Sequence, residues 1–298
     1  MRIGILYGGS SPERDVSLNS GRAIIKACND LGYQVLALDP RAGLEPLIPE
    51  LKNIDLVFNG LHGGDGENGV VSGFLDNLGV KYTGSDKNSS ILCIDKHASK
   101  ELVLKEQILT PDWISLSLDD KLIENNLKYP LVVKPNSEGS TIGLTIIKDP
   151  SRLNDAVNLA RKFDKKILLE SFIAGREITV TVVGDSAYPI IEIIPKHELY
   201  DYECKYIKGM TSYVCPAEIQ KTLSSSIQSI ALDIHNLLGC RHYSRVDFRL
   251  DKEGNPWFLE INTLPGMTET SLVPKSAATL GINFNSLIQK IIDEALKI

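Results

Sequence analysis

Short apolar segments alternate with helical patterns at the start of the chain, and this alternation limits the folds that the sequence can form. Residues 2–7 resemble a buried strand that ends at a glycine turn, and residues 17–31 place apolar side chains at helical spacing. Further strands are expected at 34–38 and 55–58, with a helix at 67–78. Strands joined through helices favour parallel βαβ units, so the N-terminal part is predicted to be a small doubly wound parallel sheet.

The rest of the chain alternates strands and helices less regularly. A helical pattern covers residues 85–107, and strand patterns follow at 113–116, 131–134, 144–147, 166–170 and 177–183. Nearer the C-terminus we expect a helix at 220–238, two strands at 242–250 and 257–261 joined by a turn, and a last helix at 285–296. The fold class is therefore α/β with α+β elements.

Charge and cysteine content exclude several classes of function. The formal net charge of the 298 residues is −6, which argues against a broad nucleic-acid-binding face, because such a face is basic. No apolar stretch reaches the roughly 18 residues of a membrane-spanning helix. The five cysteines are odd in number and lack metal-ligand spacing, so we expect free thiols and a cytoplasmic location.

A lysine at the end of an expected strand begins a small, polar, glycine-containing loop at residues 134–143, Lys-Pro-Asn-Ser-Glu-Gly-Ser-Thr-Ile-Gly. Backbone N–H groups of such a loop can bind phosphate oxygens, and Lys134 adds positive charge. The order of residues is not that of a Walker A loop. A plain hairpin is the alternative, because small polar turns are common.

Two carboxylates and an amide lie on the two expected strands near the C-terminus. Alternation places Arg245, Asp247 and Arg249 on one face of the first strand, and Glu260 and Asn262 on one face of the second. Carboxylate and amide oxygens are suited to Mg²⁺ or Mn²⁺. The apolar residues between them favour a metal site over an exposed polar face.

Other polar segments follow strands or open a helix. His62 and Glu67 lie in a glycine-rich turn beyond a strand, where open α/β sheets bind ligands, and residues 8–13 follow the first strand in the same way. The residues around Glu170 and Glu177 could receive a ribose or an adenine amino group. The polar, tyrosine-rich residues 197–213 could form a lid. Residues 262–271 open a helix whose free N–H groups suit a carboxylate.

Taken together and in this order, the motifs resemble the D-alanine–D-alanine ligases of the ATP-grasp superfamily. The resemblance rests on residues 8–17, 61–67, 134–140, 200–206, 245–247 and 260–267 and runs nearly end to end. It implies an ATP-grasp fold with three domains, residues 1–85, 86–172 and 173–298. It also implies ATP as a substrate, two Mg²⁺ or Mn²⁺ ions, D-alanine as the amino acid and a homodimer. The reaction implied is the ATP-dependent condensation of two D-alanine molecules for peptidoglycan synthesis.

The resemblance also assigns roles around the nucleotide. Lys96 and Lys134 correspond to the phosphate-binding lysines. The adenine and ribose contacts correspond to Glu170 and Glu177, with Phe172 and Ile173 packing nearby. The ligands of the two metal ions correspond to Asp247, Glu260 and Asn262.

Further roles concern the amino-acid substrates. Glu13 corresponds to the residue that holds the first ammonium group and orients a Ser140–Tyr206 pair, with His62 and Glu67 lining the first D-alanine subsite. Arg245 and the Gly266 N–H correspond to the oxyanion hole. Lys205 and Ser271 correspond to contacts of the second carboxylate.

Some alternatives remain open from the sequence. Tyr206 favours a dipeptide product, because relatives that make D-alanyl-D-lactate carry Phe at this lid position. Phe172 lies at a position where relatives in this family commonly carry an indole. Arg249 could add positive charge near the phosphates, or it could pair with Glu260. Three other functions are alternatives. Another ATP-grasp enzyme, acting on a different carboxylate and amine, would share the nucleotide-binding residues, whereas a non-enzymatic nucleotide-binding regulator would be expected to lack the metal ligands that this sequence has. A dehydrogenase would need a glycine fingerprint that this sequence lacks.

Overall fold

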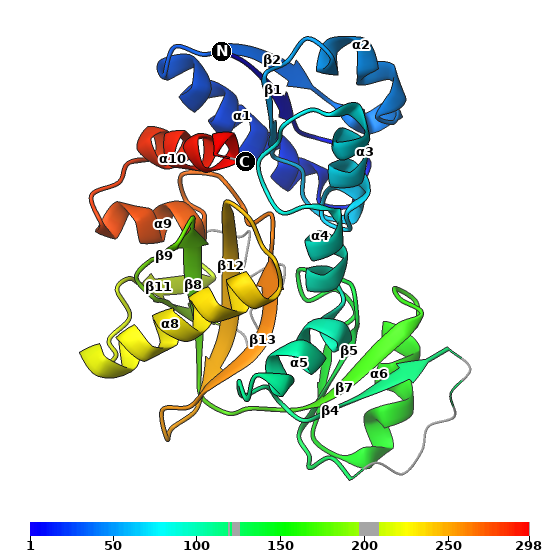
Figure 1. Ribbon diagram of the computed structural model, residues 1–298. Helices are drawn as coiled ribbons and strands as arrows, with labels where there is room; N and C mark the ends of the chain where they lie inside the picture. Colours follow the sequence, from blue (N-terminus) through cyan, green and yellow to red (C-terminus); the bar gives the residue numbers. More distant parts are fainter. Residues whose placement is uncertain (119, 121–125, 197–208, 298) are drawn as a thin grey trace.

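Three β-sheets are formed by the residues that the structure describes, and each is built from a different part of the chain (Figure 1). The computed structural model describes residues 1–118, 120, 126–196 and 209–297. The N-terminal sheet lies at the top of the view, the C-terminal sheet in the middle and the central sheet at the lower right. The mixed α/β fold class is that predicted from the sequence.

The N-terminal sheet is parallel, as the alternation of strands and helices predicts. Its strands are β1 (Arg2–Leu6), β2 (Gln34–Leu38) and β3 (Leu56–Asn59), in the order β2-β1-β3. The helices of this part are α1 (Arg14–Asp30), α2 (Ile48–Leu51) and α3 (Val70–Leu78), with 3₁₀ turns at Pro40–Ala42, Glu45–Leu47 and Gly64–Gly66. Helix α3 begins three residues after its predicted start, because Gly69 adopts the left-handed conformation at φ 89°.

The helical pattern at 85–107 forms two helices, not one. Helix α4 (Lys87–Ile94) ends at Asp95, whose extended backbone (φ −78°, ψ 95°) also begins α5 (Lys96–Lys105). The Asp95 side chain accepts a hydrogen bond from the Ala98 N–H and so caps α5. The break matters for the site because it places Lys96 at the first turn of α5.

The central sheet is antiparallel, with strand order β4-β7-β5-β6. Its strands are β4 (Trp113–Ser117), β5 (Leu131–Pro135), β6 (Thr145–Ile147) and β7 (Lys166–Ser171). A 3₁₀ turn at Pro150–Arg152 leads into α6 (Leu153–Ala160), which packs on the sheet. The Asp149 side chain caps the turn by accepting the Ser151 N–H. The hairpin of β5 and β6 carries the loop that begins at Lys134.

The C-terminal sheet has the strand order β11-β10-β8-β12-β13, with β9 paired to β8. Its strands are β8 (Arg176–Val183), β9 (Ser186–Ala187), β10 (Ile191–Pro195), β11 (Thr211–Val214), β12 (Tyr243–Leu250) and β13 (Pro256–Asn262). Strands β9, β10 and β11 were not predicted. The end of the expected lid therefore belongs to this sheet, because β11 contains residues 211–213 and pairs with β10.

Helices cover this sheet and link it to the N-terminal one. Helix α8 (Lys221–Leu237) packs on the sheet, and Cys93 of α4 and Val103 of α5 join the same core. After β13 come α9 (Leu272–Thr279) and α10 (Phe284–Leu296), and α10 lies against α1 in Figure 1. Leu287, Ile288 and Ile291 of α10 share the core of the N-terminal sheet. The end of the chain therefore stabilises its beginning.

Candidate active site

Two pockets meet where the three sheets approach one another. The intersheet pocket lies between the central and C-terminal sheets and is lined by Lys134 and Glu170 from one and by Asp247 from the other. The loop pocket, a cavity of about 430 Å³, is lined by residues of the N-terminal loops and of the segment after β13. Ser140 and Arg245 line both pockets, together with Gly139 and Glu260.

A buried group of charges forms one end of the intersheet pocket. Glu170, on β7, is 2% exposed and pairs through Oε1 with Lys100 Nζ (2.9 Å) and through Oε2 with Lys134 Nζ (2.8 Å). Burial alone raises the pKa of the Glu170 carboxyl, but the two lysines outweigh it and hold that pKa below its usual value. The sequence predicts Lys134 and Glu170 here. It gives no indication of Lys100, although the spacing of four from Lys96 places both on one helix face.

The opposite wall is the segment between β7 and β8. Arg249 donates from Nε to the Ile173 carbonyl (3.1 Å) and from Nη2 to the Gly175 carbonyl (2.6 Å). Its guanidinium lies 5.6 Å from the centre of the Phe172 ring, and Nη1 is 3.5 Å from Glu177 Oε2. Arg249 thus pairs with Glu177, whereas Glu260 pairs with Lys96 at 3.1 Å. Of the two roles left open by the sequence, pairing with Glu260 is wrong.

Strands β12 and β13 bring the predicted metal ligands together. Asp247 lies opposite Glu260, and Arg245 lies opposite Asn262, with a bulge directly after Asp247. Arg245 donates to both carboxylate oxygens of Asp247, from Nε (2.9 Å) and Nη2 (2.7 Å). Thr179 Oγ1, on the neighbouring β8, donates to Asp247 Oδ1 (2.6 Å), a contact that the sequence did not indicate.

The donors at these positions fit a divalent cation. Asp247 and Glu260 supply carboxylate oxygens and Asn262 an amide oxygen, which are hard ligands of the kind that Mg²⁺ prefers. The Asn262 amide oxygen accepts the Leu264 N–H (2.8 Å), which fixes its orientation. Within the described ranges no three His, Cys, Asp or Glu side chains gather as a metal cluster, so the third ligand here would be the amide.

The loop between β5 and β6 links the intersheet pocket to the N-terminal part of the chain. Lys96 Nζ donates to the Glu138 carbonyl (2.8 Å), and Ser140 Oγ donates to Glu13 Oε1 (2.5 Å). Ser140 and Thr141 both adopt positive φ values of 52° and 63°, which is uncommon for residues with a side chain. This backbone holds the Ser140 hydroxyl against a carboxylate 127 positions earlier in the chain.

The N-terminal loops are fixed by a short chain of hydrogen bonds. Ser11 Oγ bonds the His62 carbonyl (2.5 Å), and His62 Nε2 shares a hydrogen bond with Ser20 Oγ (2.9 Å). Ser20 Oγ also accepts the Met267 N–H (3.2 Å), which connects α1 to the segment after β13. Glu67 Oε1 accepts the Gly63 N–H (3.0 Å). Both predicted glycine-rich loops therefore lie at the same edge of the sheet.

The segment after β13 closes the loop pocket. Gly266 and Ser271 line it, and Ser271 begins α9. Ser271 Oγ accepts the Thr268 N–H (3.1 Å). A Cβ atom at Gly266 would lie 3.1 Å from Ser271 Oγ, so the glycine lets the backbone come close to that hydroxyl.

The structure brings together most of the residues that the sequence singled out. Glu13, His62, Glu67, Ser140, Arg245, Gly266 and Ser271 line the loop pocket, and Lys96, Lys134, Glu170, Phe172, Ile173, Glu177, Asp247 and Glu260 line the intersheet pocket. Asn262 lines the loop pocket beside Glu260. Lys205 and Tyr206 lie outside the described residues, so their predicted roles stay predictions.

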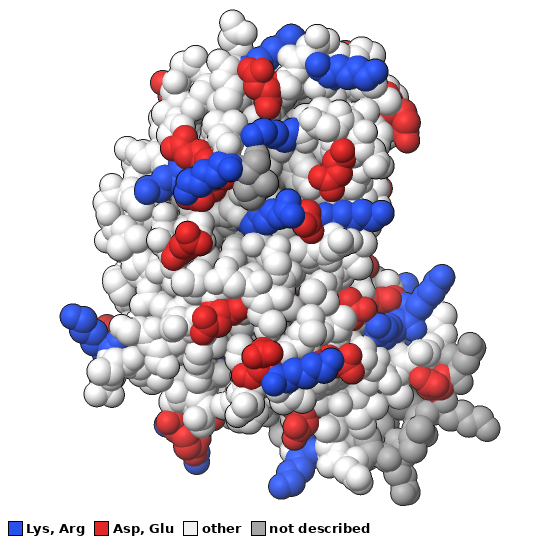
Figure 2. All heavy atoms as spheres, in the orientation of Figure 1, with Lys and Arg blue, Asp and Glu red and all other residues white. Residues whose placement is uncertain are grey.

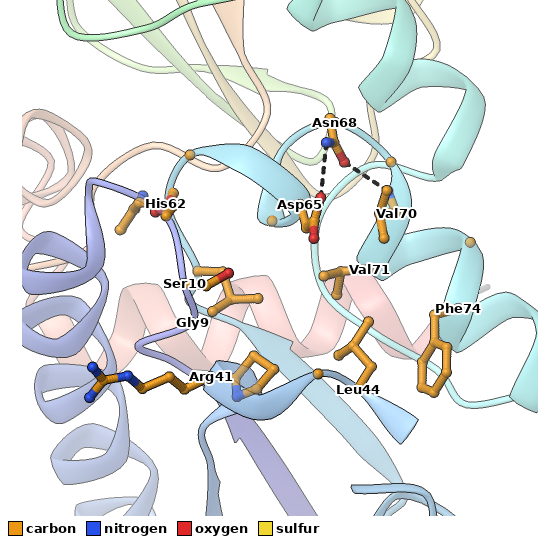
Figure 3. A pocket seen from close by; sticks show the side chains of 18 of the residues that line it. Gly9, Ser10, Arg41, Leu44, His62, Asp65, Asn68, Val70, Val71 and Phe74 are labelled. Atoms are coloured by element: carbon orange, nitrogen blue, oxygen red, sulfur yellow. Dashed lines mark hydrogen bonds between the residues drawn. The ribbon is translucent and has the colours of Figure 1, made fainter. Parts of the chain in front are cut away.

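A third pocket, of about 510 Å³, lies on the other side of the N-terminal loops (Figure 3). Leu44, Val71 and Phe74 gather on one side of it, and Asn68 donates to Asp65 (3.2 Å) at its edge. His62 lines both this pocket and the loop pocket. The loop that carries His62 therefore contributes to the lining of both cavities.

Basic and acidic side chains are interspersed over the face shown in Figure 2. This mixture agrees with the net charge of −6. The structure has no helix, among those it describes, that is long and apolar enough to cross a membrane. Cys28, Cys93, Cys215 and Cys240 are free thiols.

The fold and the site define an ATP-dependent ligase of the ATP-grasp class, in which two sheets enclose a pocket of lysines and carboxylates. The chain is similar to the D-alanine–D-alanine ligase of Bacillus anthracis complexed with ATP, with a TM-score of 0.89 and 35% identity over 100% of this chain and 98% of that one. It is also similar to the VanG D-Ala:D-Ser ligase of Enterococcus faecalis, with a TM-score of 0.87 and 29% identity over 99% of both chains.

Sequence relatives identify the family. Residues 106–293 match the family model described as D-ala D-ala ligase C-terminus. The D-alanine–D-alanine ligase of Aquifex aeolicus (strain VF5) is 44% identical over 98% of this chain and 100% of its own length. That of Actinobacillus succinogenes is 40% identical over 98% and 97%. The chain belongs to the D-alanine–D-alanine ligase family, which confirms the resemblance seen in the sequence.

Proposed function

We propose that this ligase joins two D-alanine molecules at the expense of ATP, through a D-alanyl phosphate, and that the product serves peptidoglycan synthesis. The observation that carries the proposal is the junction of the two pockets. Ser140, Arg245 and Glu260 line both, so a phosphate in the intersheet pocket and a carboxylate in the loop pocket would meet beside them. This is where a phosphoryl group would pass from one ligand to the other.

The nucleotide occupies the intersheet pocket in this proposal. Lys96 and Lys134 neutralise phosphate charge, because phosphoryl transfer depends mainly on positioning and electrostatic stabilisation. Glu170 and Glu177 contact the adenine and the ribose, and Phe172 and Ile173 provide the apolar wall. The pocket is lined by all of these residues, which supports the assignment.

Asp247, Glu260 and Asn262 would hold two Mg²⁺ or Mn²⁺ ions, which supply neutralising charge for the β- and γ-phosphates when bound. In the structure these carboxylates are paired with cationic side chains, Asp247 with Arg245 and Glu260 with Lys96. The residues are thus already arranged to bind positive charge at this point.

The first D-alanine lies in the loop pocket, with its ammonium group near Glu13 and with His62 and Glu67 lining the subsite. A carboxylate oxygen attacks the γ-phosphorus, the bond to ADP breaks, and an acyl phosphate forms. Ser140 donates to Glu13 in the structure, which supports a role for this pair in holding the substrate. Glu13 would also orient a pair formed by Ser140 and Tyr206.

The second D-alanine binds through its carboxylate to Lys205 and Ser271. After losing a proton, its amine attacks the acyl carbonyl, and phosphate leaves when the tetrahedral oxyanion collapses. Arg245 and the Gly266 N–H would stabilise that oxyanion, an effect worth about 3–4 kcal/mol for one good donor. A covering lid would keep water from the acyl phosphate. We place the enzyme in the cytoplasm as a homodimer.

The test is phosphate release from ATP and Mg²⁺ with single amino acids, followed by product analysis. We expect release with D-alanine and none with L-alanine, and a dipeptide as the product. The variant Glu13→Gln should lose most of this activity, whereas Asp15→Asn, which changes an exposed carboxylate in the first turn of the helix that Glu13 precedes, should keep it. Release that depends on another carboxylate or amine, but not on D-alanine, would identify a different ATP-grasp reaction. Light scattering after gel filtration tests the homodimer.

A further inference from the structure

Lys100 is a fully buried cation that lies behind the nucleotide pocket without lining it. Its side chain is 0% exposed, and its Nζ lies 2.9 Å from Glu170 Oε1 and 5.2 Å from the centre of the Trp113 ring. Trp113 lies directly opposite Glu170 in the sheet. Burying an ammonium group costs free energy unless the group is paired with an opposite charge. The burial of Lys100 beside Glu170 therefore calls for a functional explanation.

Glu170 is shared between two lysines that face different surroundings. Lys134 approaches Oε2 from the intersheet pocket, which it lines, and Lys100 approaches Oε1 from the protein interior. The three groups carry a net charge of +1. One ammonium is therefore in excess over the carboxylate, and the accessible one is that of Lys134.

We infer that Lys100 is a positioning residue for nucleotide binding: it holds the Glu170 carboxylate so that Lys134 can leave it for a phosphate. The inference rests on the proposed function, which places a nucleotide in this pocket. Without Lys100, any phosphate that drew Lys134 away would leave Glu170 as a buried carboxylate without a counter-charge. With Lys100 present, Glu170 stays ionised and remains in position to accept a hydrogen bond from the adenine of the nucleotide.

The helix that carries Lys100 links the two ends of the pocket. Lys96 and Lys100 are one turn apart on α5, and they pair with Glu260 on β13 and Glu170 on β7 respectively. Burial lowers the pKa of Lys100 to about 8, against the opposing effect of Glu170, so the group is largely protonated at neutral pH. A charged Lys100 is what the positioning role requires.

The test measures nucleotide affinity directly and in turnover. In Lys100→Met we expect the dissociation constant of ATP and its KM to rise by at least about tenfold, which is about 1.4 kcal/mol, while the KM of D-alanine changes by less than about twofold. Lys105→Met, an exposed lysine at the end of the same helix, is the matched control and should behave as the wild type. Lys100→Gln serves as the second variant if Lys100→Met does not fold.

A double-mutant cycle with Glu170→Gln separates this role from a structural one. If Lys100 acts through the Glu170 charge, Lys100→Met should weaken ATP binding little further once that charge is absent. An equal loss in both backgrounds, or a loss confined to kcat or to the KM of D-alanine, would overturn the inference. Nucleotide binding without D-alanine-dependent turnover would refute the proposed function alone, since the binding measurement still tests Lys100.

Discussion

Arg249 clamps the segment that joins the central and C-terminal sheets, and removing the clamp should weaken nucleotide binding. The guanidinium donates to the carbonyls of Ile173 and Gly175 and lies over the Phe172 ring, and the side chain is only 19% exposed. Phe172 and Ile173 both line the intersheet pocket. The variant Arg249→Met should therefore loosen one wall of that pocket while leaving its charged end in place.

The magnitude follows from the contacts. A hydrogen bond to a charged group contributes about 1.5–3 kcal/mol, and a cation–π contact at a partly exposed site about 0.5–1 kcal/mol. Gly175 is exposed, so water can replace the arginine at its carbonyl, and we take the clamp as about 3 kcal/mol in total. If about half of this orders the wall for the nucleotide, the KM of ATP rises roughly tenfold.

The assay compares the KM of ATP, the KM of D-alanine and the melting temperature in Arg249→Met, Arg249→Lys and Lys252→Met. Lysine keeps the charge but lacks the planar fork that reaches two carbonyls, so Arg249→Lys should be nearly as impaired as Arg249→Met. Lys252, on the following turn, is 89% exposed and serves as the control. Full recovery in Arg249→Lys would refute the clamp and support the other role open from the sequence, a contribution to the phosphate field.

Three further changes test other parts of the structure. Arg245→Met should lower kcat about 10²–10³-fold with a smaller change in the KM of ATP, and a kcat within threefold of the wild type would contradict its oxyanion role. Gly175→Ala should lower the free energy of unfolding by about 1–3 kcal/mol because of the backbone φ of +143° alone. A further cost is expected because the new Cβ would lie 2.1 Å from the Leu250 carbonyl oxygen. An unchanged urea midpoint would show that the turn adjusts to the side chain. Burial lowers the pKa values of His235 and His242 to about 4, below their unfolded value near 6.5, so the folded state binds fewer protons than the unfolded state. The free energy of unfolding should therefore be full above pH 6.5 and should fall toward pH 4, by up to about 3 kcal/mol per histidine. Urea unfolding at several pH values measures this fall, which the variant His242→Asn should reduce.

The regular part of the fold could be predicted because its signals are local. Strand β2 has the predicted bounds of 34–38, and the hairpin of β12 and β13 has its predicted turn, since alternation and turn residues are short-range properties. Strands β10 and β11 were missed. Strand β10 lies between β8 and β11, so its identity depends on partners that are distant in the sequence. The packing of α10 against α1 depends on tertiary contacts in the same way.

The site residues could be found at the ends of strands and in polar loops, but their pairings could not. The sequence indicated Lys134, Glu170 and Arg249 as separate candidates. It did not indicate that a lysine on α5 shares Glu170, or that Arg249 binds the backbone of residues 173 and 175. Such contacts are set by how helices and sheets pack, which a pattern along one segment does not encode. A cation four residues from another on an expected helix was the available signal for Lys100.

The charges of the site explain how an acidic chain can bind an anionic ligand. Each cation expected to touch a phosphate or the oxyanion already contacts a carboxylate: Lys96 contacts Glu260, Lys134 contacts Glu170, and Arg245 contacts Asp247. With Lys100 this set has four cations and three carboxylates, so the set is nearly neutral before the ligand binds.

Binding can then proceed by exchange of partners. In the proposed function, phosphates would take Lys96 and Lys134, and metal ions that accompany the nucleotide would take Asp247 and Glu260. Arg245 would then be released for the oxyanion, and Glu170 would keep Lys100, so that no carboxylate of this set is left unpaired. Glu170 differs from the other two carboxylates because it is proposed to contact the base and not a metal ion. Glu170 also differs in being paired with a second, buried lysine, Lys100. In this set Glu170 therefore has two lysine partners, whereas Asp247 and Glu260 have one cation each, because only Glu170 must stay ionised without a metal ion once the nucleotide is bound.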